Sequence, residues 1–150
     1  MRNRGFEVVS AYKKDDIALP QRKTQGSAGY DLAAATTTII APGEVVLVPT
    51  GLKAYMAAGE YLGLHIRSGL ATKQKLCLVN GQGIVDADYY NNPDNEGHIL
   101  LALLNMGSTE AVLQKGERVA QGIFYNYLLC DDDQAAAQTR QGGFGSTGEK

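Results

Sequence analysis

The stretch from Thr37 to Ile66, TTIIAPGEVVLVPTGLKAYMAAGEYLGLHI, consists of short apolar runs separated by turn-forming residues. Thr37–Ile40 and Val45–Pro49 flank Pro42-Gly43, a pair typical of tight turns. Other apolar runs include Phe6–Tyr12, Tyr61–Ile66, Ile99–Leu104 and Val119–Leu128. Short runs with this punctuation favour an all-β sandwich or barrel over alternating strand–helix units.

Helical structure is expected in one place, Gly69–Lys75, with Ser68 as its N-cap. Residues Asp131–Thr139 are typical of a polar connector, although a short C-terminal helix remains an alternative. We therefore expect one domain over residues 1–139, followed by a flexible arm over residues 140–150.

Composition limits the class of protein. A chain of 150 residues is long enough for one domain that buries about two-thirds of its unfolded surface. A net charge of −2 gives no reason to expect nucleic acid or an anionic membrane as a partner. No apolar run approaches the ~18 residues of a membrane span, and the first residues lack the apolar stretch of a signal peptide. We expect a cytoplasmic protein.

The two cysteines, Cys77 and Cys130, are too few for a disulfide framework and lack metal-ligand spacing. We expect both to be reduced and buried.

The C-terminal stretch RQGGFGSTGEK, Arg140–Lys150, has the composition of a ligand-binding lid. Its four glycines allow close approach to a ligand, Phe144 offers an aromatic face, and Arg140 offers a planar fork for phosphate. Ser146 and Thr147 add hydroxyl donors. These features suit a segment that closes over a nucleotide, and the alternative is a frayed terminus.

Four internal segments carry further chemistry. Ala28–Leu32 places Asp31 after a glycine turn, and Arg67–Ala71 places a guanidinium and a hydroxyl at a helix start, where phosphate is favoured. Gly81–Tyr89 resembles a hairpin that carries Asp86 and Asp88 on one strand face, a pair that could supply a general base. Gly116–Gln121 combines a turn with a strand start. Each segment alone is also typical of ordinary turns and capped helices.

In this order, the five segments resemble the motifs of the trimeric dUTP pyrophosphatase (dUTPase) family, from about Ala28 to Gly148. The resemblance implies a jelly-roll-like β fold and a homotrimer with active sites at the subunit interfaces. It also implies hydrolysis of dUTP to dUMP and pyrophosphate, which removes dUTP and supplies dUMP for thymidylate synthesis. The cofactor would be Mg²⁺, held mainly by the triphosphate.

The resemblance implies a role for each matched residue. Asp86 would be the general base for the water that attacks the α-phosphorus, Gln121 would position that water, and Asp31 would hold Mg²⁺ through water. Tyr89 would pack against the deoxyribose. The uracil contacts would be Asn80, Gly83, Ile84, Val85, Leu100 and Phe144. The phosphate contacts would be Arg67, Ser68, Gly69, Arg140, Gly145, Ser146 and Thr147.

The chain departs from the family pattern in three places. Ile66 stands where proline is common, and Arg140 is one residue nearer to Phe144 than expected. Residues 90–96, YNNPDNE, are longer than the expected tight turn and are typical of an exposed loop. No role is assigned to His65 or His98.

Three alternative functions remain at this point. A deoxycytidine triphosphate deaminase would share the fold, but the sequence offers no separate deaminating residues. A regulatory protein could use the nucleotide pocket as a switch, with a partner docked on the 90–96 loop. A structural β protein would have to carry five ordered motifs by chance.

Overall fold

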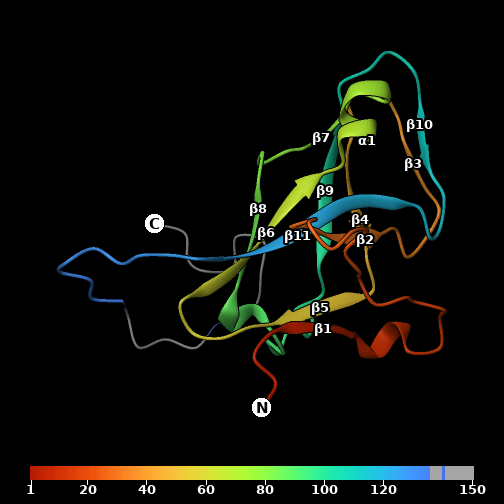
Figure 1. Cartoon of the computed structure of the whole chain (residues 1–150). Helices are drawn as coiled ribbons and strands as arrows, with labels where there is room; N and C mark the ends of the chain where they lie inside the picture. The colour runs from red at the N-terminus through yellow and green to blue at the C-terminus, as the bar shows by residue number, and fades with distance from the viewer. Residues whose placement is uncertain (136–139, 141–150) are drawn as a thin grey trace.

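A computed structural model describes residues 1–135 and residue 140 of the chain (Figure 1). These residues form eleven short strands, one short α-helix and two single-turn 3-10 helices. The strands are β1 (Gly5–Val8), β2 (Tyr30–Ala33), β3 (Thr38–Ile40), β4 (Val45–Pro49), β5 (Leu52–Tyr55), β6 (Glu60–Ile66), β7 (Leu76–Leu78), β8 (Gly83–Asp86), β9 (Leu100–Asn105), β10 (Ala111–Leu113) and β11 (Arg118–Asn126). The helix α1 spans Ser68–Lys73, and the 3-10 turns η1 and η2 span Ser10–Tyr12 and Ala87–Tyr89.

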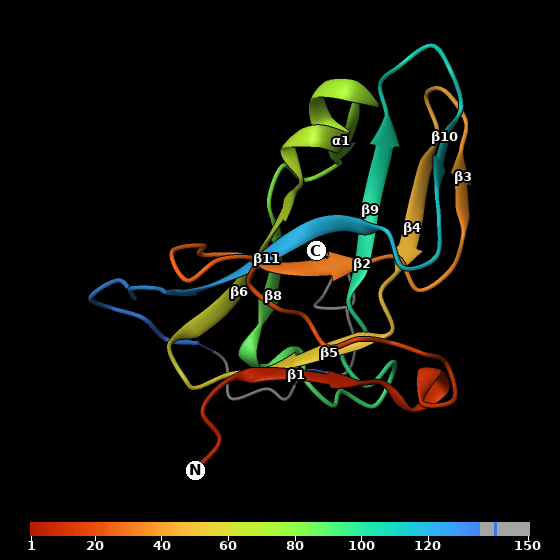
Figure 2. The ribbon, with the colours of Figure 1, turned by 45° about the vertical axis from the view of Figure 1, so that its right-hand side comes forward.

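The described strands pair in antiparallel fashion in four small sheets. The largest has the order β2-β11-β6-β8, and a three-stranded sheet has the order β4-β9-β7. Two strand pairs, β1-β5 and β10-β3, complete the molecule. Figures 1 and 2 show β1 and β5 crossing one end of the molecule, with α1 at the opposite end. The predicted all-β class with one short helix is confirmed.

The core is made by alternation along these strands. In β9, Leu101 and Leu103 are fully buried, whereas Leu100, Ala102 and Leu104 are partly exposed. In β8, Gly83 and Val85 are buried, whereas Ile84 and Asp86 face outward. A strand has a side-chain period of two residues, so each strand contributes one face to the core and one face to its surroundings.

The helix begins one residue earlier than predicted. Arg67 is the N-cap: its backbone is extended, and its carbonyl accepts the amides of Leu70 and Ala71 at 3.1 Å. Ser68 is therefore the first helical residue, and the prediction that it caps the helix is wrong. The helix also ends at Lys73 rather than Lys75, because Lys75 has a positive φ of 54° that cannot continue it.

The prediction of a hairpin at Gly81–Tyr89 is also wrong. Strand β8 pairs with β6, and the chain turns into η2 directly after Asp86. Asp86 and Asp88 therefore do not share a strand face, because Asp88 lies in the 3-10 turn.

Other expectations need smaller corrections. The run Phe6–Tyr12 is divided between β1 and η1. Cys77 is partly exposed because β7 directs it away from the buried Leu76 and Leu78, and Cys130 is exposed after the end of β11. The 90–96 loop is not wholly exposed, since Asn92 is buried.

Residues 131–135 form a turn and a segment without regular secondary structure, and the rest of the predicted connector, 136–139, lies outside the described residues. Nearly all of the predicted arm, 141–150, also lies outside them. Within the described ranges, no helix is long and apolar enough to cross a membrane.

Candidate functional site

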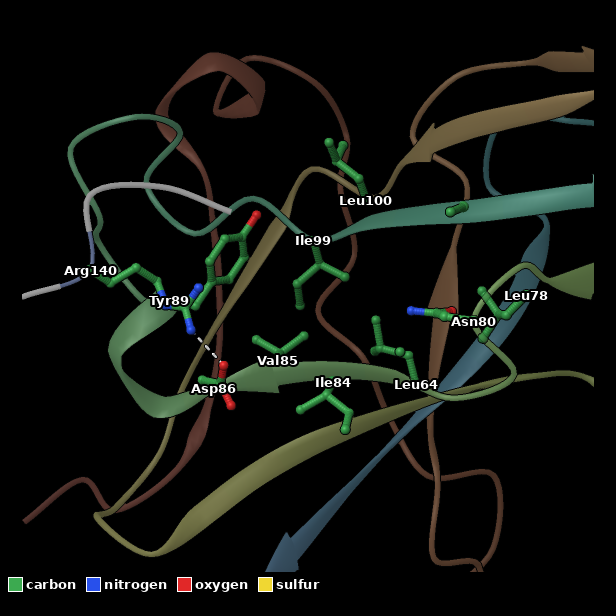
Figure 3. Close-up of a pocket in the computed structure, with 12 residues that line it drawn as sticks. Leu64, Leu78, Asn80, Ile84, Val85, Asp86, Tyr89, Ile99, Leu100 and Arg140 are labelled. Atoms are coloured by element: carbon green, nitrogen blue, oxygen red, sulfur yellow. Dashed lines mark hydrogen bonds and ion pairs between the residues drawn. The ribbon is translucent and has the colours of Figure 1, made fainter. Parts of the chain in front are cut away.

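An apolar pocket of about 220 Å³ opens between β8 and β9, where an edge of the four-stranded sheet faces the three-stranded sheet (Figure 3). Alternation along β9 explains one wall: Leu100 and Ala102 line the pocket, while the intervening Leu101 is fully buried in the core. The lining residues are Leu64, Leu78, Asn80, Gly83, Ile84, Val85, Asp86, Tyr89, Ile99, Leu100, Ala102 and Arg140.

Polar side chains occupy the two ends of this pocket. Figure 3 shows Asp86, Tyr89 and Arg140 at one end and Asn80 at the other. The two ends are separated by β8, whose Val85, together with Ile99, makes the middle of the pocket apolar. A flat apolar group with polar edges would fit this distribution.

The backbone of β8 adds hydrogen-bonding capacity. Among the described strands, β8 is an edge of its sheet and pairs only with β6. In an antiparallel edge strand, alternate N–H and C=O groups point away from the partner strand and can bind a ligand. Gly83, Ile84 and Val85 therefore bring donors and acceptors to a pocket with few polar side chains.

Asp86 is an exposed carboxylate held by one cation. Its Oδ2 lies 2.6 Å from Nη2 of Arg140, whose Nε donates to Oδ1 of Asp88 at 2.8 Å. The Asp86 side chain is 52% exposed, so water reaches it, whereas that of Arg140 is only 16% exposed. A reachable carboxylate can orient a water molecule and accept its proton.

Tyr89 is buried, and its ring forms a wall of the pocket. Its phenol donates to the His98 carbonyl at 2.7 Å and accepts from Nδ2 of Asn95 at 2.8 Å. Burial raises the pKa of the Tyr89 phenol, which therefore stays neutral at physiological pH. The imidazole of His98 accepts the Gly51 amide at 2.9 Å, which is a structural contact.

A second cavity is lined by the remaining predicted site residues of the described chain. It is lined by Asp31, Arg67, Ser68, Gly69 and Gln121, together with Lys23, Ser27, Gly29, Leu70, Lys73, Gln74, Glu117 and Arg118. Asp31 is paired with Arg118, at 3.1 Å between Oδ2 and Nη1, and more loosely with Arg67 at 3.8 Å. Four cationic side chains face two carboxylates here, an excess of positive charge that suits a phosphate ligand.

Gln121 lies directly over Gly29 in this second cavity. A Cβ at Gly29 would stand 2.3 Å from Oε1 of Gln121, so the glycine is what makes room for the amide. The glycine turn before Asp31 thus fixes both the carboxylate and the amide on neighbouring strands.

The two cavities share none of their lining residues. Asp31 lies on β2 and Asp86 on β8, at opposite edges of the four-stranded sheet. Asp31 pairs with Gln121 of β11, which in turn pairs with His65 of β6, whereas Asp86 pairs directly with Tyr61 of β6. Three strand spacings and four residues along β6 put the two aspartates roughly 20 Å apart. The described chain therefore does not bring all predicted residues into one site.

Sequence reasoning missed several lining residues. Arg118 could have been predicted from the sequence, because it lies inside the Gly116–Gln121 motif. Lys23 lies in a loop that carries no local sequence signal. The apolar walls Leu64 and Leu78 carry no signal that separates them from core residues. The predicted contacts Phe144, Gly145, Ser146 and Thr147 lie outside the described residues.

Comparisons with known proteins agree with these observations. The dUTPase family model matches residues 15–148. A deoxyuridine 5'-triphosphate nucleotidohydrolase from Lactococcus lactis subsp. lactis is 53% identical over 149 residues, which cover 99% of this chain and 99% of that protein. The crystal structure of dUTPase from Streptococcus mutans is 51% identical, covers 85% of this chain and 98% of that chain, and has a TM-score of 0.81.

A dUTPase from phage phi11 of S. aureus shares the fold at 18% identity, with a TM-score of 0.74 over 90% of this chain and 97% of that one. The predicted jelly-roll-like fold is thereby confirmed. The family model over residues 15–148 and the 53% identity to the Lactococcus lactis protein also confirm the resemblance found in the five motifs, and this chain belongs to the dUTPase family.

Proposed function

We propose that this protein hydrolyses dUTP to dUMP and pyrophosphate. The observation that carries the proposal is the pocket between β8 and β9, with the exposed Asp86 at one end and Asn80 at the other. Its size and polarity suit a pyrimidine nucleoside, and family membership supports the choice of dUTP. The reaction would remove dUTP and supply dUMP for thymidylate synthesis, in the cytoplasm.

Asp86 is the general base of the proposed reaction. It orients one water molecule and takes its proton as the water oxygen attacks the α-phosphorus, with pyrophosphate as the leaving group. Phosphoryl transfer needs in-line placement and neutralisation of charge more than covalent assistance. Gln121 positions the water, and Arg67, Ser68 and Gly69 bind the phosphates.

Nucleoside selection is assigned to the β8 pocket. Asn80 and the backbone of Gly83–Val85 pair with the uracil edge, while Leu100 adds a backbone contact and Phe144 stacks on the ring. Cytosine is rejected because its donors and acceptors would leave buried polar groups unpaired. Tyr89 packs against the deoxyribose, where a 2′-hydroxyl would clash.

Magnesium is the proposed cofactor. The described residues contain no group of three or more His, Cys, Asp or Glu that could hold a metal. A single hard carboxylate such as Asp31 fits an ion that keeps its waters and takes its other ligands from substrate phosphates. Asp31 would hold Mg²⁺ through water, and the bound ion would neutralise phosphate charge.

The active site is proposed to form between subunits of a homotrimer. One nucleotide cannot reach both Asp31 and Asp86 of a single chain if they lie roughly 20 Å apart across the sheet. A ring of identical chains solves this problem by placing the phosphate cavity of one chain against the β8 pocket of its neighbour.

The C-terminal arm is proposed to close over the phosphates. Arg140, Gly145, Ser146 and Thr147 supply the contacts. The guanidinium of Arg140, which grips the carboxylates of Asp86 and Asp88 in the single chain, can offer the same planar fork to phosphate oxygens.

Pyrophosphate release from dUTP, dTTP, dCTP and UTP, measured with and without Mg²⁺, tests the proposal. We expect rapid release from dUTP alone, and only with Mg²⁺. Ammonia release from dCTP would instead identify a deaminase, and no turnover of any of the four nucleotides would reject an enzymatic role.

A further inference from the structure

The loop that follows Tyr89 is built from asparagine side chains. Asn92 is 5% exposed, and its Nδ2 donates to the Tyr89 carbonyl at 2.7 Å and to Oδ1 of Asn95 at 2.8 Å. Its Oδ1 accepts the amides of Asp94 and Asn95 at 3.0 and 3.1 Å. A buried side chain with all of these bonds made fixes the shape of the loop.

Asn95 connects this loop to the phenol of Tyr89. Its Oδ1 accepts from Asn92 and from the Gly97 amide at 3.0 Å, which leaves Nδ2 to donate to the Tyr89 oxygen at 2.8 Å. The phenol hydrogen is used on the His98 carbonyl, because a carbonyl can only accept. The phenol oxygen therefore requires a donor at position 95, and the amide supplies it.

The chain returns directly against Tyr89. Gly97 has a φ of +85°, and a Cβ there would lie 2.6 Å from the Tyr89 carbonyl oxygen. No other residue fits this position without moving the backbone. Tyr89 is thus enclosed between Asn95 at its phenol and Gly97 at its main chain.

The far side of the loop is anchored to the N-terminal strands. The Glu96 carboxylate accepts the amide and hydroxyl of Ser10 at 2.9 and 3.0 Å and pairs with Lys53 of β5 at 3.0 Å. Lys53 is only 8% exposed and also donates to Asn91 at 2.6 Å. The loop is therefore bonded to η1 and β5 on one side and to Tyr89 in the pocket wall on the other.

From this geometry we infer that Asn95 is a positioning residue that holds the Tyr89 ring in the pocket and thereby sharpens selection of deoxyribose over ribose. The inference rests on the proposed function, in which Tyr89 packs against the sugar. A ring fixed at both its phenol and its main chain cannot move aside for a 2′-hydroxyl, whereas a ring released at the phenol can.

The test is Asn95→Asp. The carboxylate keeps the acceptor used by Asn92 and Gly97 but gives the phenol a second acceptor in place of a donor. The single phenol hydrogen can then satisfy either the His98 carbonyl or the carboxylate but not both, so the ring loses one of its two hydrogen bonds. We expect the ratio of kcat/KM for dUTP to that for UTP to fall by at least about fivefold, the scale of one hydrogen bond. The change should come mainly through KM, with kcat for dUTP within about twofold of wild type, because Asp86 is untouched.

The matched control is Asp94→Asn, the reverse exchange in the same loop. In the part of the chain that the structure describes, the exposed Asp94 hydrogen-bonds in the loop through its backbone amide, and its carboxylate acts on the Tyr89 phenol through charge alone. This variant should keep the wild-type ratio. A second control repeats Asn95→Asp in a Tyr89→Phe background, where no phenol remains to be held and the ratio should not fall further.

An unchanged ratio in Asn95→Asp would overturn the inference even if the variant melts earlier, since that is what a purely structural role predicts. An equal fall in both backgrounds would also overturn it. If Asn95→Asp does not fold, Tyr89→Phe alone decides, because it must lower the ratio while leaving the loop intact. Wild-type protein that releases no pyrophosphate from dUTP would reject the proposed function and the inference with it. Wild-type activity with an unchanged ratio would reject the inference alone.

Discussion

Asp86 combines exposure to water with a tight contact to one cation. Its carboxylate is half exposed, yet Oδ2 lies 2.6 Å from the Arg140 guanidinium. The neighbouring Asp88 shares the same guanidinium and has nearly the same exposure, 57%. Two carboxylates with such similar surroundings are hard to tell apart by environment alone. Their positions differ, because Asp86 ends β8 and lines the pocket, whereas Asp88 lies in η2 and does not line it.

Exchange of Asp86 for asparagine is the residue-scale test. The amide is nearly isosteric and can still orient water, but it cannot accept a proton. We expect Asp86→Asn to bind a non-hydrolysable dUTP analogue normally and to lose at least ~10²-fold in kcat. Pyrophosphate release and analogue binding measure the two effects separately.

Asp88→Asn is the matched variant, since it also neutralises one carboxylate that pairs with the Arg140 guanidinium. It should retain most of the turnover. Near-normal kcat in Asp86→Asn, combined with a large loss in Asp88→Asn, would transfer the role of base to Asp88.

At the scale of elements, the 90–96 loop and the β1-β5 pair form one unit. Lys53 joins them through Glu96, at 3.0 Å, and through Glu7, at 3.9 Å. Lys53 and the Ser10 amide hold the pKa of Glu96 below its usual range, while the Tyr90 phenol has the largest effect in lowering the pKa of Glu7. A carboxylate with a lowered pKa stabilises the fold above the ordinary glutamate pKa of about 4.3, and this contribution is lost as pH falls through the lowered value.

Lys53→Met tests this unit. The variant keeps the apolar stem but removes the cation, so it should melt several degrees lower than wild type at pH 7, where about 2–4 °C corresponds to 1 kcal/mol in a protein of this size. It should also lose less stability than wild type between pH 5 and about pH 3, because Glu96 no longer has its main reason for a lowered pKa. Thermal unfolding across this pH range is the measurement.

The control is Lys14→Met, which removes the same charge from an exposed position. Its melting temperature and acid dependence should match wild type. A Lys53→Met protein with the wild-type acid dependence would show that Lys53 does not govern the titration of Glu96.

The elements differ in how far local sequence predicts them. Val45–Pro49 was predicted to the residue because the continuous apolar run and the Pro42-Gly43 turn before it are local signals. The short strands β2, β5, β7 and β10 were not among the predicted runs, since three or four residues carry too little periodicity. The 90–96 loop was predicted as exposed from its asparagines, whereas Asn92 is buried because its side chain bonds replace water. Composition does not reveal whether an asparagine bonds to solvent or to its own loop.

At the scale of the whole molecule, the motif order in the sequence does not reveal how the predicted site residues are distributed over one chain. Asn80, Asp86, Tyr89 and Arg140 share one pocket, whereas Arg67 and Asp31 line another cavity at the opposite edge of the sheet. The strand order β2-β11-β6-β8 sets this separation. The number of residues between motifs does not reveal which strands pair, because the paired strands are far apart in the sequence. The proposed site would therefore draw on two chains.

Mixed assemblies test this requirement. An Asp86→Ala chain and an Arg67→Ala chain should each be nearly inactive. In a mixed cyclic trimer whose sites pair Asp86 of one chain with Arg67 of the next, one site of three is intact. Random mixing at equal amounts makes about three-quarters of the trimers mixed, so about a quarter of wild-type activity should return.

A second mixture supplies the control, wild type with a chain that carries both Asp86→Ala and Arg67→Ala. Sites shared between chains then predict about a quarter of the activity of an all-wild-type sample, whereas sites within one chain predict about half. Subunit exchange is confirmed by mass in both mixtures. Absence of recovery in the first mixture, together with half activity in the second, would place the whole site within one chain. The sheet would then have to rearrange to close the roughly 20 Å between Asp31 and Asp86. The continuous pairing of β11 with β6, from the pair Ala120 and Ile66 to the pair Asn126 and Glu60, opposes such a rearrangement.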